Sequence, residues 1–192
     1  MKNVLVLFAV MTMLISSTFA QGLGFKGIGA GVGYTSVSVS NVDGSETLPG
    51  FAFSAHANLG EIIENLSLYP EVQYFTTSKD FSDPSLPNTT ATWKLNDFAI
   101  NINAHYNFST SGSFLPYIGA GIGYNMLSTD ITVTGDYSGT MSATDTKLGI
   151  NILAGANYNV SPSLSLFLEP RYILVSDLNH LIVKAGFTYS LL

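Results

Sequence analysis

The sequence predicts an all-β fold, an eight-stranded antiparallel up-and-down transmembrane β-barrel. Three observations predict it: side chains alternate between apolar and polar along most of the chain, charge is scarce, and the segments between apparent strands alternate between long and short. Only 10% of the 192 residues are charged and 46% are hydrophobic. A soluble domain carries about 25% charged residues, so a surface facing water on all sides would be short of charge.

Composition also excludes several classes of protein. The net charge of −6 and the low pI argue against nucleic-acid binding. The chain has no cysteine, which excludes disulfides, zinc fingers, iron–sulfur clusters and thiol catalysis. Aromatic and β-branched residues are too abundant for a disordered chain, and the length suggests one domain.

Residues 1–20 are predicted to be a secretory signal peptide. Lys2 provides the positive start, an apolar run follows from Val4 to Ile15, and Thr18-Phe19-Ala20 places small residues at a cleavage site. The alternative is an N-terminal membrane helix, for which the apolar run is short. The barrel domain is therefore expected over residues 21–192.

The strands are predicted from alternation with a period of two. In the segment Phe98–Phe108, Phe98, Ile100 and Ile102 share one face while Asn101 and Asn103 occupy the other. Eight such segments are found, at residues 25–39, 49–59, 66–77, 92–108, 114–127, 145–158, 163–175 and 180–191. Most reach the 9–11 residues that a tilted strand needs to cross a bilayer.

The connections separate the two ends of the predicted barrel. Residues 40–48, 78–91 and 128–144 are long and rich in Ser, Thr, Asn, Asp and Gly, and they are expected to be three mobile external loops. The connections at 60–65, 109–113 and 159–162 are short, as is 176–179 on the long-loop side. Long loops at one end and tight turns at the other are typical of an outer-membrane barrel with both termini in the periplasm.

The face that points outward is inferred from charge and from the aromatic residues. A soluble lipocalin-like barrel would place its apolar face inside and leave Gly, Asn and Ser to face water. Lipid, by contrast, solvates the apolar face directly. Eight aromatic residues on this face form two predicted interfacial belts: Tyr106, Phe108, Tyr158 and Tyr189 near the short turns, and Tyr34, Tyr74, Tyr124 and Tyr172 near the long loops.

The two halves of the chain echo each other. IGAGVGY at 28–34 matches IGAGIGY at 118–124, and LSLYPEVQY at 66–74 matches LSLFLEPRY at 164–172. Duplication of a half-barrel and convergence on shared constraints remain equally open. Pro70 and Pro170 each remove a ladder donor in mid-strand, so a bulge or a lost hydrogen bond is expected at each.

The C-terminal strand resembles the assembly signal of bacterial outer-membrane proteins. Its residues Lys184, Gly186, Tyr189 and Leu191 fit the order of a polar residue, glycine and two alternating hydrophobic residues, although Leu192 follows where a terminal Phe is usual. With the signal peptide and the eight strands, the chain is similar to small OmpA/OmpX-type outer membrane β-barrels over its whole mature length. The resemblance implies contact with outer-membrane lipid or lipopolysaccharide, recognition by the assembly machinery, and a monomer.

Strand parity places a set of polar residues inside the barrel. The expected interior network is Glu71, Gln73, Lys147, Asn151, Glu169, Arg171 and Lys184. Buried charges must pair, and Arg171 is placed to bridge Glu71 and Glu169. Eight strands leave room only for side chains, so a polar plug is favoured over a gated path for small solutes. Glycines on the same face are expected to make room for the larger side chains.

Catalytic chemistry has one weak candidate in the sequence. A lipid-modifying enzyme would need a Ser–His pair with an orienting acid, and only His180, in a predicted short loop near Ser176 and Asp177, offers it. His56 and His105 are expected to point inward near the short turns. No cofactor and no metal cluster are predicted.

The functional prediction is a non-enzymatic barrel of a Gram-negative outer membrane, with a role in envelope structure or in adhesion through its loops. A narrow OmpW-like passage for small or hydrophobic solutes and a lipid-modifying enzyme are the alternatives. The loops are acidic, with Asp80 and Asp130 among several carboxylates and Lys79 as their only base. This acidity fits either recruitment of divalent cations or plain solubility.

Overall fold

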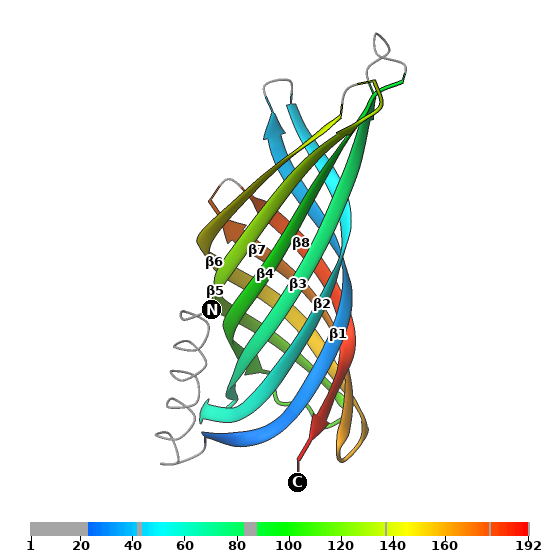
Figure 1. The fold of residues 1–192 in the computed structure, drawn as a ribbon. Coiled ribbons are helices and arrows are strands. Elements are labelled where there is room, and N and C mark those ends of the chain that lie inside the picture. The colour runs from blue at the N-terminus through cyan, green and yellow to red at the C-terminus, as the bar shows by residue number, and fades with distance from the viewer. Residues whose placement is uncertain (1–22, 42–43, 83–87, 137, 177, 192) are drawn as a thin grey trace.

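Eight antiparallel strands close in chain order into one barrel, in which β1 pairs with β8 (Figure 1). This computed structural model describes residues 23–41, 44–82, 88–136, 138–176 and 178–191. The strands are β1 (Leu23–Asn41), β2 (Gly44–Ile63), β3 (Leu66–Ser82), β4 (Thr90–Asn107), β5 (Phe114–Thr134), β6 (Gly139–Ser161), β7 (Leu164–Val175) and β8 (Asn179–Ser190). The predicted fold and strand number are therefore confirmed.

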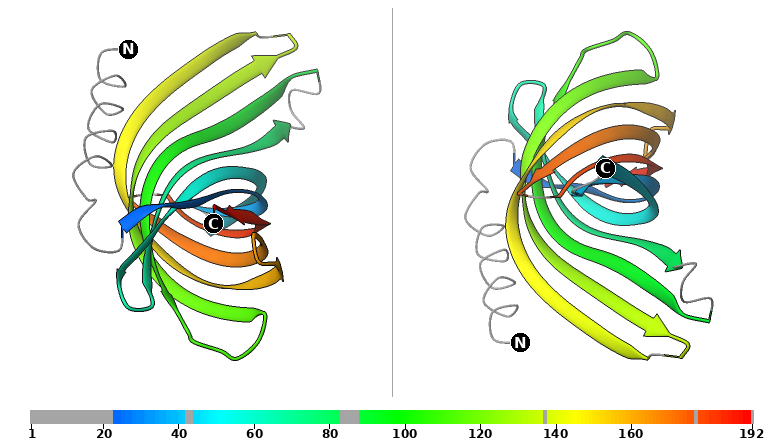
Figure 2. Two further views of the ribbon diagram at one scale, coloured as in Figure 1. Left: turned by 90° about the horizontal axis from the view of Figure 1, so that it is seen from below. Right: turned by 90° about the horizontal axis from the view of Figure 1, so that it is seen from above.

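The apolar side of the wall faces outward, as predicted. All eight aromatic residues of the two predicted belts are exposed, and so are aliphatic side chains between the belts such as Ile122, at 65%. Polar residues such as Asn101 and Asn151 are buried inside. Seen from either end, the strands form a single curved wall around this interior (Figure 2). No helix within the described residues is long and apolar enough to span a bilayer.

The predicted long loops are largely strand, which corrects their expected boundaries. β5 continues to Thr134 instead of ending at 127, and β6 begins at Gly139 instead of 145. Pairing runs without a register shift from Asn107↔Tyr117 to Thr90↔Thr134. The Thr-, Ile- and Val-rich sequence favours strand, and pairing between neighbours does not require lipid. As a result, β3 to β6 rise at the loop end beyond β7 and β8 (Figure 1).

Both mid-strand prolines interrupt a ladder, as expected. Beside Pro70, the β2–β3 register shifts between His56↔Glu71 and Glu61↔Ser67. Beside Pro170, the β6–β7 register is the same on both sides, but Ala154 and Gly155 have no partner in β7. The first interruption is a bulge and the second a local loss of pairing.

Inward-facing glycines provide space for interior side chains. A Cβ on Gly31 would lie 2.8 Å from Cζ of Phe167, and one on Gly33 would lie 2.9 Å from Cγ of Lys184. A Cβ on Gly121 would overlap Oδ1 of Asn103. The small residues of β1 and β5 therefore fit the larger side chains that point across the lumen.

Candidate functional site

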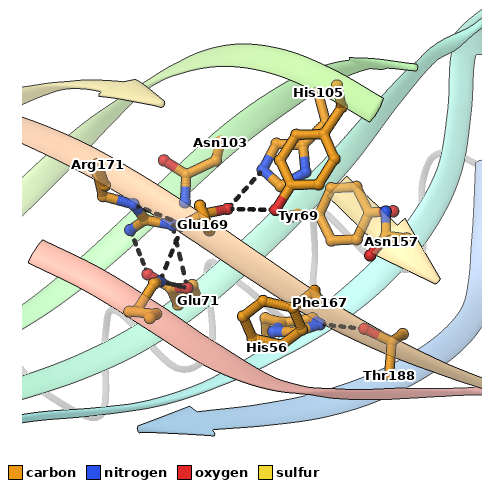
Figure 3. A pocket seen from close by; sticks show the side chains of 12 residues that line it. His56, Tyr69, Glu71, Asn103, His105, Asn157, Phe167, Glu169, Arg171 and Thr188 are labelled. Carbon is orange, nitrogen blue, oxygen red and sulfur yellow. Dashed lines mark hydrogen bonds and ion pairs between the residues drawn. The ribbon is translucent and has the colours of Figure 1, made fainter. Parts of the chain in front are cut away.

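The centre of the lumen holds two acids and two bases from three strands, here called the charged cluster: Glu71 of β3, Glu169 and Arg171 of β7, and Lys184 of β8. Arg171 bridges the two carboxylates (Figure 3). Its Nε and Nη2 donate to Glu169 Oε1 at 3.0 and 2.8 Å, and its Nη1 and Nη2 donate to Glu71 Oε1 and Oε2, the second at 3.2 Å.

Lys184 completes the pairing of the charged cluster. Its Nζ lies 2.7 Å from Glu71 Oε2 and 3.2 Å from Glu169 Oε1. The four residues are between 1% and 5% exposed, and their formal charges sum to zero. Each charge of this cluster therefore has a partner of opposite sign, which offsets the cost of removing it from water.

Amides extend the polar network across the lumen. Asn101 donates to Glu71 Oε1 at 3.3 Å, and Asn151 donates to the side-chain oxygens of Asn101 and Asn103 at 3.0 and 2.9 Å. Gln73 accepts a hydrogen bond from Arg171 at 3.5 Å. These contacts tie β4 and β6 to the charged cluster.

Aromatic and histidine rings lie to one side of the charged cluster (Figure 3), and the strand register identifies it as the short-turn side. Tyr117 donates to Glu169 Oε2 at 2.9 Å, and the ring of His105 stacks between Tyr117 and Tyr69 at centroid distances of 4.6 and 4.2 Å. His56 contacts Phe167 edge-on. Tyr117 and its stack were not foreseen as part of the site, although their odd-numbered positions already placed them on the inward face.

An apolar cluster fills the lumen on the other side of the charged cluster, toward the loop end. Its members are Val37, Leu48, Ala52, Phe75, Leu95, Leu127, Ile173, Val175, Leu178 and Ile182, with Trp93 packed against them. Between the ring layer and the charges the interior holds a cavity of about 20 Å³, which is space for about one water molecule. The lumen is thus packed with side chains at three levels.

The expected interior residues do not all come together. Six of them are buried and joined in one hydrogen-bond and ion-pair network, whereas Lys147 lies nearer the loop end; the six are Glu71, Gln73, Asn151, Glu169, Arg171 and Lys184. Its Nζ is 3.5 Å from Asp145 Oδ2 and donates to Ser176 O at 3.1 Å.

Residues of the proposed assembly signal occupy two environments. Lys184 belongs to the charged cluster, and Gly186 packs against β1, where a Cβ would overlap Ala30 O. Tyr189 and Leu191 are exposed on the outer face.

His180 lies in β8, within the predicted strand 180–191, and not in the short loop that was expected to hold it near Ser176 and Asp177. It is 1% exposed; its ring packs 4.7 Å from that of Phe75, and Nδ1 lies 3.3 Å from Leu178 O. Asp177 falls outside the described residues. No group of three or more His, Asp or Glu side chains in the described ranges is arranged to hold a metal ion.

Several solved structures that are similar to this chain are bacterial outer-membrane proteins. Neisserial surface protein A matches with a TM-score of 0.55 and 23% identity, covering 85% of this chain and 97% of its own. The Ail protein of Yersinia pestis, in complex with a heparin analogue, matches at 0.50 and 15%, covering 86% and 99%. The outer membrane protease OmpT of Escherichia coli matches at 0.54 and 11%, covering 91% and 100%. At these identities the likeness concerns the fold.

No curated protein matches the sequence. A family profile, by contrast, covers nearly the whole chain: the outer membrane protein beta-barrel domain matches residues 6–190. The match agrees with the eight closed strands, the outward apolar face and the aromatic belts. The chain belongs to the outer membrane protein beta-barrel domain family.

Proposed function

We propose that the chain is a non-enzymatic barrel of a Gram-negative outer membrane that has a closed lumen and acts at the cell surface through its loop end. One observation carries the proposal: the lumen is filled by the charged cluster, with the ring layer on one side and the apolar cluster on the other. Between the ring layer and the charged cluster, the described residues enclose a cavity of about 20 Å³, so solute passage would require several buried contacts to break together.

Planar-bilayer conductance tests the closed lumen. The purified barrel is expected to insert without single-channel steps, because the Arg171 and Lys184 ion pairs span the lumen. A double variant, Arg171→Ala with Glu71→Ala, opens the centre and serves as a comparison. Reproducible single-channel steps from the unmodified chain would contradict the proposal and favour the narrow-passage alternative.

The alternative of a lipid-modifying enzyme is supported only by a fold shared with a protease and by one buried histidine. OmpT is a protease, but at 11% identity it shares only the fold. The histidine nearest the loop end, His180, is 1% exposed and packs against Phe75. A His180→Ala variant that still migrates as a folded barrel is expected to leave lipid A chemistry of the host cell unchanged; an altered lipid A profile would support an enzyme.

The proposed partners follow from the two exposed surfaces. The outer apolar face contacts lipid or lipopolysaccharide, and the C-terminal strand is presented to the assembly machinery. At the loop end, Asp80 and Asp145 are exposed and Asp130 is partly exposed, so neutral or cationic partners fit better than a polyanion such as the heparin analogue bound by Ail. Cells that display the chain are expected not to bind immobilised heparin; salt-sensitive binding would refute this preference.

A further inference from the structure

The polarity of the barrel wall inverts above the loop-end aromatic belt. In the membrane, even-numbered residues of β4 and β5 point outward and are apolar, such as Phe98 and Ile122. Nearer the loop end the same outward positions carry Thr92, Lys94 and Asn96 in β4, and Ser128, Asp130 and Thr132 in β5. Because alternate residues of a strand face opposite sides, the inner face there is the apolar one.

All four strands of this region share the inversion. We call it the projecting sheet: residues 78–82, 90–96, 128–134 and 139–147. Its inner face carries the apolar residues Phe81, Trp93, Ile131, Val133, Met141 and Ala143, together with the polar residues Lys79, Thr129, Asp145 and Lys147. Among these, Phe81, Ile131 and Met141 remain 45%, 40% and 75% exposed. An exposed apolar face rimmed by polar residues indicates a binding surface.

A pocket lies at the base of this inner face. Its volume is about 260 Å³, and it is lined by Trp93, Leu95, Leu127, Thr129, Ala143, Asp145, Lys147 and Leu178. Leu95, Leu127 and Leu178 belong to the apolar cluster, so the floor of the pocket is continuous with the packed interior. The ion pair between Lys147 and Asp145 stands at the more exposed side.

The pocket lies outside the bilayer. Trp93 is five residues beyond Phe98, which is level with Tyr74 of the belt. At about 3.3 Å per residue this is about 16 Å along the strand, and for a strand tilted by about 40° it is about 12 Å above the belt. The pocket is therefore open to the aqueous side at the loop end.

We propose that this pocket binds one small single-chain amphiphile, with its apolar chain on Trp93 and the three leucines and an uncharged polar head beside Asp145 and Lys147. The volume is just below the range of about 300–1,000 Å³ of common ligand sites, which suits one chain and excludes a whole multi-chain lipid. The floor presents no hydrogen-bonding side chain, which disfavours a saccharide. The site deepens the proposed surface role and rests on it.

Trp93 is the only tryptophan, so its fluorescence reports the pocket directly. The full chain is placed in phospholipid vesicles and titrated with 10-bromodecan-1-ol, whose bromine quenches an indole on contact. Quenching should saturate because the pocket holds one probe molecule. Probe dissolved in the bilayer should add no quenching, because it does not reach Trp93. Ala143→Phe fills the pocket and should abolish the saturable component, whereas Ser142→Phe, the neighbouring residue on the outer face, should retain it. Heat-modifiable gel migration verifies that both variants are folded.

Three results would overturn the site. One is weak quenching that rises linearly and equally in all three proteins. A second is saturable quenching that Ala143→Phe leaves intact. A third is efficient disulfide cross-linking of a Met141→Cys variant into a dimer with no probe binding, which would assign the inner face to a second copy. Each leaves the conductance result untouched, so the failure of the site and that of the closed lumen are distinguishable.

Discussion

Replacing Arg171 by Met should lower the free energy of unfolding more than replacing any exposed charged residue of the chain. Arg171 holds both Glu71 and Glu169, and it is 1% exposed. Without it, two buried carboxylates share Lys184 as their only close basic partner within the charged cluster. Removing one partner of a buried ion pair costs about 3–5 kcal/mol, so the free energy of unfolding should fall by about that amount. The matched control, Lys147→Gln, breaks a partly exposed pair and should cost about 0–1 kcal/mol.

Urea unfolding in lipid vesicles measures the difference, with the folded fraction read from gel migration of unheated samples. The double variant Arg171→Met with Glu169→Gln leaves one acid, Glu71, paired with one base, Lys184. Its loss of stability should be about 0.5–3 kcal/mol smaller than the sum of the two single losses. If Arg171→Met costs no more than Lys147→Gln, or if the double variant is fully additive, the charged cluster does not act as a tightly paired unit and the reasoning is refuted.

Three further substitutions test the packing and the membrane boundary by the same unfolding assay. Gly31→Ala should cost about 1–3 kcal/mol through overlap with Phe167; a neutral result would mean that the ring moves freely. Ile122→Arg, on the lipid face, should cost about 2–4 kcal/mol. Thr132→Arg, on the outer face of the projecting sheet, should change stability by no more than about 0.5 kcal/mol. Equal costs for the two variants would contradict the proposed position of the membrane boundary between them. Leu95→Ala should cost about 2–5 kcal/mol if the apolar cluster is a packed core, and a smaller loss would contradict that packing.

The facing of each residue was predictable from the sequence because it depends only on strand parity. Tyr124 is exposed and Asn125 is buried, as alternation requires. The bridging position of Arg171 between two carboxylates followed from the same argument combined with the cost of unpaired buried charge.

Height along the barrel was not predictable, because it depends on the stagger between strands. Lys147 has the same parity as Asn151 but lies level with Asn125, nearer the loop end, and so pairs with Asp145 instead of joining the charged cluster. The strand ends were misjudged for a different reason. Residues 128–144 were expected to be a loop because they are rich in Ser, Thr, Asp and Gly, whereas they pair as strand up to Thr134 and again from Gly139, with apolar residues at odd positions such as Ile131.

The seam between β1 and β8 has a consequence for how the barrel forms. Its strands join Gly27–Ser38 to Asn179–Ser190, segments nearly a whole chain length apart. Such pairing is slow, since closing a long loop carries an entropic cost before any contact forms. On the β1 side, Gly29, Gly31 and Gly33 bring no side chains to this seam, whereas β8 brings Lys184 and Ile182 into the charged and apolar clusters. If closure is the last event on the folding pathway, it therefore also completes the ion pairing of Glu71 and Glu169, and the glycines of β1 leave the space that Lys184 needs.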